Sequence, residues 1–128
     1  MEFNIQKGYK HTSMRVVQKE DTASIYGSGL AEVFSTPAMV ALMEKTCFEL
    51  AGKFLPASHS TVGSELNIRH VKACPVGETI VCEATFTGQE GRKLTFDVNV
   101  TGPKGVIGSG THCRHIIDFK EFSEKAKK

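Results

Sequence analysis

The chain has 128 residues, of which 40% are hydrophobic and 23% are charged, a composition typical of a globular protein with one core. Its net charge is only +2, and its basic residues are scattered apart from the terminal KAKK, which gives no support to a nucleic-acid-binding protein. The longest apolar run, 37–43, is far shorter than the roughly 20 residues that cross a membrane. We therefore expect one domain over residues 1–128 and no membrane partner.

Four widely spaced cysteines predict buried thiols rather than disulfides or a zinc site. No two of them form a CxxC motif, and the opening residues MEFNIQKGYK lack the apolar core of a secretory signal. Reduced cysteines without such a signal are typical of a cytoplasmic protein, so we expect that location and no metal site. The cysteines are Cys47, Cys74, Cys82 and Cys113.

One or two strand-like pieces, including SMRVVQ, precede a long predicted helix. Thr36 is expected to cap this helix, with Pro37 at the first helical position, where its missing N–H costs nothing. The helix is expected to end at Gly52 or Lys53, because Pro56 prevents its continuation. Its apolar stripe consists of Met39, Val40, Met43, Thr46, Cys47, Leu50 and Ala51.

Glu44 lies at the edge of this stripe rather than among the other charges of the helix. At about 100° per residue, Lys45 and Glu49 fall on the solvent side, whereas Glu44 falls beside Val40. A carboxylate there is expected to be partly desolvated, which would raise its pKa and make it a better general base. The alternative is a boundary residue that reaches water.

The second half of the chain predicts an antiparallel sheet. Apolar and polar residues alternate over 80–87 and 93–100, as in strands that cover a core on one face. The segments CPVGE, TGQEGRK and TGPKG separate apolar runs and are typical of hairpin turns. We therefore expect four strands in a meander over 62–117, then a short terminal helix within DFKEFSEKAKK. One helix against one antiparallel sheet is an α+β arrangement, in which the sheet would wrap the helix.

His70 continues an apolar row in the segment VGSELNIRH. Alternation places Ser64, Leu66 and Ile68 on the same strand face as His70, and we expect that face to point inward. A lone histidine there is more often a satisfied core residue than a catalyst. However, a single helix offers it few partners, and Glu44 is one of them. The two side chains either meet or flank one substrate, with His70 as acid or orienter and Glu44 as base.

Two further positions carry polar chemistry. The Thr36 hydroxyl lies at a helix N-terminus, where free N–H groups and the helix dipole favour an anion, although a simple cap is the default interpretation. In the last strand, VIGSGTHCRHII, Arg114 shares a face with His112 and with two glycines that permit close backbone approach. Arg114 is expected either to hold a phosphate or carboxylate or to form a structural ion pair. His115 points to the opposite face, which argues against a metal ion between the two histidines.

Four motifs, in this order, resemble those of a known enzyme family. They are EVFSTPAMVALME, VGSELNIRHVKACPVG, EGRKLTF and IGSGTHCRHII, and they cover most of residues 32–117 without insertions. The order of elements resembles the hotdog fold, and the motifs resemble the fluoroacetyl-CoA thioesterase branch of the acyl-CoA thioesterases. The segment before the helix is shorter and less aromatic than in that branch, which leaves the acyl group open.

The resemblance implies hydrolysis of a small acyl-CoA to a carboxylate and free CoA, without a metal or redox cofactor. It places the catalytic residues at Thr36, Glu44 and His70, which would activate water or form a transient acyl-enzyme. It also places a glycine lining the acyl site at Gly63 and an arginine near the acyl end of the substrate at Arg114.

The same resemblance implies a homodimer whose sheets join edge to edge, with active sites at the interface, and leaves open a tetramer of two dimers. An exposed edge strand needs such a partner in any case. Two alternative functions remain: a hotdog hydratase or dehydratase, and a non-catalytic module that binds acyl-CoA.

Overall fold

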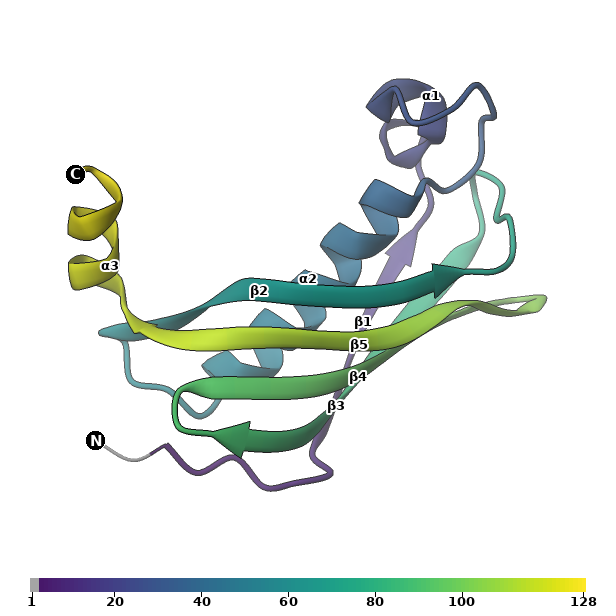
Figure 1. The fold of residues 1–128 in the computed structure, drawn as a ribbon. Helices are drawn as coiled ribbons and strands as arrows, with labels where there is room; N and C mark the ends of the chain where they lie inside the picture. Colours follow the sequence, from purple (N-terminus) through teal and green to yellow (C-terminus); the bar gives the residue numbers. More distant parts are fainter. Residues whose placement is uncertain (1–2) are drawn as a thin grey trace.

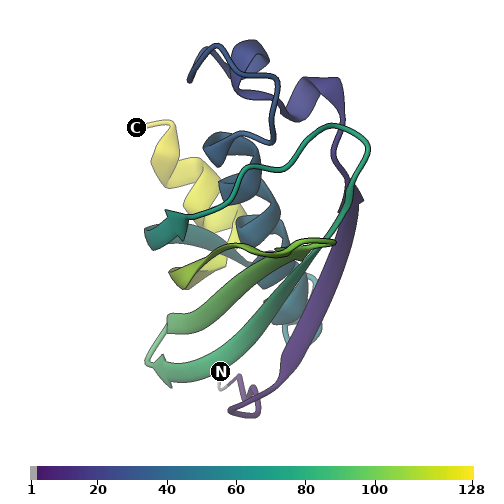
Figure 2. The same cartoon turned by 90° about the vertical axis from the view of Figure 1, so that its right-hand side faces the viewer.

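The computed structural model describes residues 3–128, in which one long helix packs against a five-stranded antiparallel sheet (Figure 1). The sheet curves around this helix, which occupies its concave side (Figure 2). This is the α+β arrangement that the sequence predicts. The elements are β1 (Lys10–Val16), a 3₁₀ turn (Lys19–Asp21), α1 (Ala23–Tyr26), α2 (Thr36–Gly52), β2 (His59–His70), β3 (Thr79–Glu90), β4 (Lys93–Gly102), β5 (Gly105–Asp118) and α3 (Phe119–Ala126).

The strands follow the order β1-β3-β4-β5-β2, and all neighbouring pairs are antiparallel. β3, β4 and β5 form a meander, but β2 pairs with β5 at the edge of the sheet, so the predicted four-strand meander is wrong. The segment 71–78, which includes the expected hairpin turn, instead crosses from one edge of the sheet towards the other. Within it, the Cys74 carbonyl oxygen accepts the Phe34 N–H at 2.8 Å. Alternation shows which face a strand buries, but not which strand lies beside it.

The start of α2 also differs from the prediction. Ser35, not Thr36, is the N-cap, because its Oγ accepts the N–H of Ala38 at 3.1 Å. Thr36 is the first helical residue, and the helix ends at Gly52 as expected. Both hydroxyl residues precede the same proline and both suit an N-cap, so the sequence alone does not separate them. The consequence is a Thr36 hydroxyl that is available to another partner.

The core lies between the inner face of α2 and the concave side of the sheet. The four cysteines are buried free thiols, as predicted. One glycine of β5, Gly108, lies directly under the helix: a Cβ added there would come within 2.8 Å of Met39 Cε, so glycine permits this close approach. The completely buried residues include Met39, Met43, Cys47 and Leu50 of α2 and Ile80, Cys82, Leu94, Phe96 and Val100 of the sheet.

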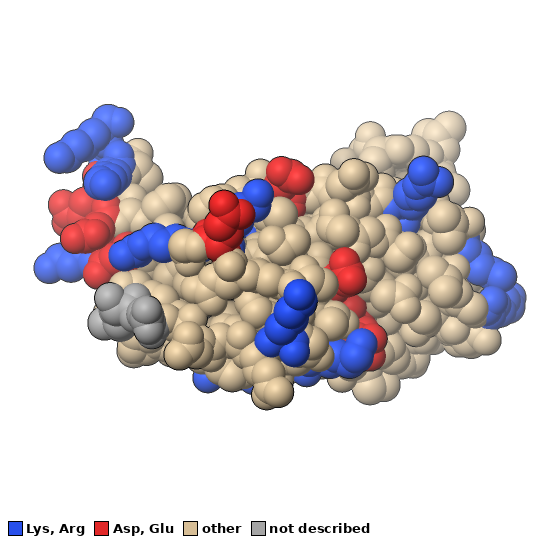
Figure 3. Space-filling view, turned by 60° about the horizontal axis from the view of Figure 1, so that its bottom comes forward, with Lys and Arg blue, Asp and Glu red and all other residues tan. Residues whose placement is uncertain are grey.

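Charged side chains are mixed on the outer surface. On the face shown in Figure 3, acidic and basic residues are interspersed over a mostly uncharged surface. Within residues 3–128, no helix is long and apolar enough to cross a membrane. The same residues contain no group of three or more His, Cys, Asp or Glu side chains placed to hold a metal ion.

Candidate active site

One side of α2 carries a row of side chains directed at β2 and β5. Thr36, Val40, Glu44 and Phe48 follow one another at intervals of four residues, which places them on one ridge of the helix. These side chains are exposed or half-buried, unlike the buried face of α2. Because β2 is an edge strand, the ridge runs along an open side of the sheet.

Thr36 and His70 form a direct contact near the N-terminus of α2. Thr36 Oγ1 lies 2.8 Å from Nδ1 of His70, the last residue of β2, and His70 Nε2 is buried without a hydrogen-bond partner. Burial is the main cause that lowers the pKa of His70. The main chain of Lys72 lies close enough to raise the pKa in part, although it forms no hydrogen bond with Nε2. The ring is therefore neutral at pH 7, and a neutral Nδ1 at this distance can accept the hydroxyl proton and activate Thr36 as a nucleophile.

A surface pocket of about 270 Å³ opens beside this pair. Its walls come from the segment before α2, the start of α2, the end of β2 and the first residues of the crossover that follows β2. The Phe34 ring approaches the His70 ring edge-on, with 6.3 Å between the centroids. The residues that line the pocket are Val33, Phe34, Thr36, His70, Val71, Lys72 and Ala73.

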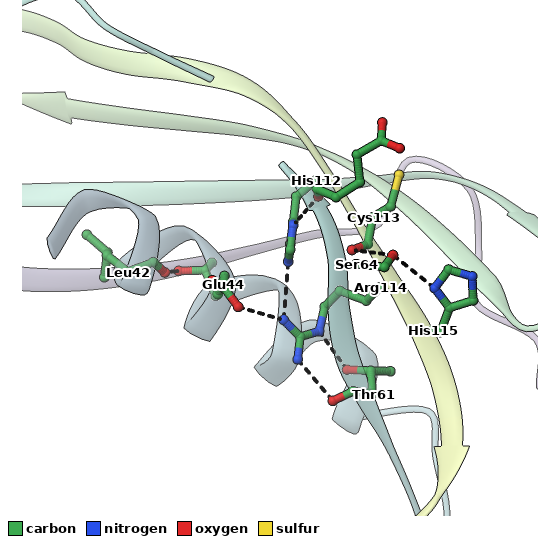
Figure 4. Close-up of polar contacts among 10 residues, drawn as sticks. Leu42, Glu44, Thr61, Ser64, His112, Cys113, Arg114 and His115 are labelled. Carbon is green, nitrogen blue, oxygen red and sulfur yellow. Dashed lines mark hydrogen bonds and ion pairs between the residues drawn. The ribbon is translucent and has the colours of Figure 1, made fainter. Parts of the chain in front are cut away.

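Glu44 lies beside a buried guanidinium farther along the ridge. Arg114 of β5 is only 6% exposed, and its Nε and NH2 donate to Thr61 Oγ1 at 2.7 Å and Thr61 O at 3.0 Å (Figure 4). Its NH1 lies 3.7 Å from Glu44 Oε2, whose side chain remains 45% exposed. Burial lowers the pKa of Arg114 and the Glu44 carboxylate opposes this, so the guanidinium remains a cation. The pair places a half-solvated base beside a fixed positive charge.

Gly63 completes this cluster because of a bulge in β2. The pairing of β2 with β5 shifts between Gly63 and Glu65, so Ser64 is the extra residue and is exposed, contrary to the inward position expected for it. Gly63 faces the helix instead. A Cβ at position 63 would lie 3.0 Å from Glu44 Oε2 and 3.5 Å from Arg114 NH1, so any larger residue would crowd the Glu44 carboxylate.

The structure does not bring Glu44 to His70. Thr36 and Glu44 are eight residues apart, which corresponds to about 12 Å along the helix axis. Glu44 therefore contacts Arg114 while His70 contacts Thr36, and the expected meeting of Glu44 and His70 is wrong within one chain. The second expectation, that the two flank one substrate, is compatible with this arrangement. We call Thr36 and His70 the hydroxyl half-site, and Glu44, Gly63 and Arg114 the carboxylate half-site.

The sequence analysis assigned no role to two residues that contact Arg114 of the carboxylate half-site, Thr61 and His112. Thr61 supplies two acceptors to Arg114, but it precedes the bulge, where simple alternation no longer reports the face. His112 lies 3.2 Å from Arg114 through its Nε2. The sequence did indicate the position of His112, because His112 and Arg114 are two positions apart in one strand and therefore share a face.

Comparison with known proteins gives one family over most of the chain. Residues 17–120 match the family model described as fluoroacetyl-CoA-specific thioesterase. A curated relative, the fluoroacetyl-CoA thioesterase of Streptantibioticus cattleyicolor, is 34% identical over 96 residues, which cover 75% of this chain and 69% of the relative.

Solved structures share the fold. A structure of the fluoroacetyl-CoA thioesterase FlK matches with a TM-score of 0.91 at 30% identity and covers 97% of this chain and 96% of its own. A hot-dog-like protein from Thermanaerovibrio acidaminovorans matches with a TM-score of 0.86 at 19% identity, over 94% of this chain and 89% of that protein. The expected hotdog fold is thereby confirmed.

Proposed function

The chain belongs to the fluoroacetyl-CoA-specific thioesterase family, a family of thioester hydrolases, and we propose that it hydrolyses a small acyl-CoA to a carboxylate and free CoA. One observation in the structure carries this proposal: the 2.8 Å contact between Thr36 Oγ1 and the neutral imidazole of His70. A hydroxyl paired with a neutral base is the arrangement that nucleophilic attack on an acyl carbon requires.

The proposed reaction has two steps. Thr36 Oγ1 attacks the thioester carbon while its proton passes to Nδ1 of His70; the C–S bond then breaks, and the thiolate of CoA takes that proton. Glu44, supplied by the second copy described below, next removes a proton from water, and the hydroxide attacks the Thr36 ester. The ester C–O bond breaks, Thr36 Oγ1 takes the proton held by Glu44, and the product acid loses its own proton to water and leaves as the carboxylate. The acyl group would occupy the space that Gly63 leaves open, with the Arg114 cation at its end. The reaction draws on no metal or redox cofactor.

We place the complete site between two copies of the chain, because one copy separates the two half-sites. β2 lies at a sheet edge, and a second β2 can pair with it in antiparallel fashion about a two-fold axis. Pairing centred on Asn67 would set Glu65 of one copy opposite Arg69 of the other. Because Ser64 is the extra residue of the bulge, His70 of one copy would then lie opposite Gly63 of the other, with both facing their helices. The hydroxyl half-site of each copy would then adjoin the carboxylate half-site of its partner.

The remaining expectations stay part of this proposal. A single thioesterase-like domain spans residues 1–128. The chain forms a homodimer, with a tetramer of two dimers as the alternative, and it acts in the cytoplasm. None of these expectations adds a residue to the proposed site.

A thiol-release assay tests the proposal directly. Purified protein is incubated with short, branched, aromatic and halogenated acyl-CoAs, and free CoA is measured with a thiol reagent. We expect turnover of at least one of them, and a loss of roughly 10²-fold in Glu44→Ala and in His70→Ala, the scale of a lost acid–base group. Glu49→Gln changes a carboxylate of the same helix that contacts Ser13 of β1 and lies outside the site; it is the matched control and is expected to keep full activity.

The other outcomes separate the alternatives. Full activity in both variants would contradict the assignment of the site. Tight acyl-CoA binding without release of thiol would favour a binding module, whereas a change in enoyl-CoA absorbance without release of thiol would favour a hydratase.

A further inference from the structure

His112 of β5 is a buried imidazole that the proposed reaction does not use. It is 2% exposed, and its ring lies against Phe96 of β4, with 6.4 Å between the ring centroids. Its two nitrogens nevertheless have defined partners on two sides. Nδ1 lies 2.8 Å from the main-chain oxygen of Glu65, and Nε2 lies 3.2 Å from NH1 of Arg114 (Figure 4).

The chemistry of these partners fixes the tautomer. A guanidinium group has only donors, so Nε2 must accept the N–H of Arg114. A main-chain oxygen has only lone pairs, so Nδ1 must carry the hydrogen and donate it to Glu65 O. Both contacts are satisfied only by a neutral ring that is protonated at Nδ1.

We propose that His112 is a positioning residue, which as a neutral acceptor holds the guanidinium of Arg114 against the space between Glu44 and Gly63. This inference rests on the proposed thioesterase function, because that space is where the acyl group would lie. His112 itself does not touch the substrate.

The hydrogen-bond partners of the Arg114 guanidinium show how His112 positions it. Thr61 binds Nε and one NH2 hydrogen, and His112 binds one NH1 hydrogen. NH1 carries a second hydrogen, and Glu44 Oε2 is 3.7 Å from NH1, too far for a strong direct hydrogen bond. One donor of a buried cation therefore stays available beside Gly63.

Protonation of His112 would abolish this arrangement. A charged ring would direct an N–H at the N–H of Arg114, placing donor against donor and cation against cation. The charged groups around the ring are Arg114 on its own strand and Glu44 on α2, and the main-chain oxygen of Glu65 on β2 faces Nδ1. Burial is the main cause that lowers the pKa of His112, and Arg114 lowers it further, whereas the Glu65 carbonyl and Glu44 oppose the shift. The ring is therefore neutral at pH 7.

Two substitutions at this position separate positioning from packing. In His112→Gln the side-chain oxygen can reach the place of Nε2 and still accept from Arg114. In His112→Asn the shorter amide reaches only the place of Nδ1, so the acceptor is lost. We expect kcat/KM to fall about 10-fold or more in His112→Asn, the scale of a lost hydrogen bond to a charged group, and to recover substantially in His112→Gln.

The controls make the result decisive. His115→Asn changes a histidine on the opposite face of β5, where Nδ1 lies 2.9 Å from Ser64 Oγ, and is expected to keep wild-type kcat/KM. Thermal unfolding checks that each variant is folded. Wild-type kcat/KM in folded His112→Asn would overturn the proposal, and so would equal losses in the Asn and Gln variants.

A measurement without catalysis tests the same inference. Long-range ¹H–¹⁵N NMR on the wild-type protein should show a neutral His112 that is protonated at Nδ1 at pH 7. A ring protonated at Nε2 would overturn the positioning role even if the enzyme is active. A wild-type protein that cleaves no thioester would instead contradict the proposed function, and the NMR result would still decide how His112 holds Arg114.

Discussion

At the scale of single residues, the hydroxyl half-site depends on a histidine that stays uncharged. His70 Nδ1 can take the Thr36 proton only while it carries no proton of its own. The ring is half-buried, and its Nε2 has no partner that would stabilise a positive charge. The structure therefore favours the form that works as a base.

This leads to a prediction for the pH profile. Burial lowers the pKa of His70 from 6.5, so the neutral base should persist below that pH. kcat/KM should be level near pH 7 and should fall with an apparent pKa below 6.5 as the pH decreases. The folded state also loses stability in that range, because the unfolded chain binds the proton more tightly.

The measurement combines kcat/KM across pH with an NMR titration of His70. The variant His112→Gln should keep the acid limb, because glutamine does not titrate and His70 is unchanged. An acid limb centred above 6.5, or one that disappears with His112, would contradict the assignment.

At the scale of elements, the sequence predicted the long helix, its end at Gly52 and the alternating strands. It did not predict the partner of β2, because alternation reports burial and not pairing. It also missed the bulge at Ser64, where one extra residue exchanges the faces of the strand, and so it placed Ser64 rather than Gly63 towards the helix by periodicity alone. The cap was assigned to Thr36 because two adjacent hydroxyls fit the same rule.

The pairing of β2 with β5 gives a prediction for stability. A Cβ at Gly110 would overlap the main-chain oxygen of Asn67 and come within 2.6 Å of Ile68 Cα, so the two strands would have to separate. We expect Gly110→Ala to lower the free energy of unfolding by about 2 kcal/mol or more, on the scale of overpacking a rigid site. The change should be measured by urea unfolding at equilibrium.

Gly88→Ala provides the matched control. Gly88 is also a strand glycine with an ordinary φ, and a Cβ there would meet no atom within 4 Å. Equal stability in the two variants would show that β2 can move away from β5 at little cost. The positions of Gly63 and His70 on β2 would then be less fixed than the structure indicates.

At the scale of the whole molecule, the four motifs and their order were enough to predict the fold and the family. The grouping of the site residues was not predictable in the same way. Thr36 and Glu44 lie on the side of α2 that carries the contacts to His70 of β2 and Arg114 of β5, but wheel geometry gives a direction around the helix and not a distance along it. The separation of Glu44 from His70 appears only when the helix and β2 are placed together.

This separation makes a prediction about the assembled protein. Two differently tagged chains, one with Glu44→Ala and one with His70→Ala, are co-expressed, and the mixed dimer is purified through both tags. If each site joins the hydroxyl half-site of one chain to the carboxylate half-site of its partner, one site of the mixed dimer is intact and the other lacks both groups. The mixed dimer should then show about half of wild-type activity, as expected for two equivalent sites related by a two-fold axis.

A site built within one chain gives the opposite result, because every site of the mixed dimer then lacks one group and activity stays at the level of the single variants. Doubly tagged dimers that carry Glu44→Ala in both chains are the control for incidental recovery. Light scattering on the wild-type protein must first show a dimer or a tetramer. A monomer that hydrolyses acyl-CoA would exclude the shared site, since the roughly 12 Å between Thr36 and Glu44 would then have to be bridged within one chain.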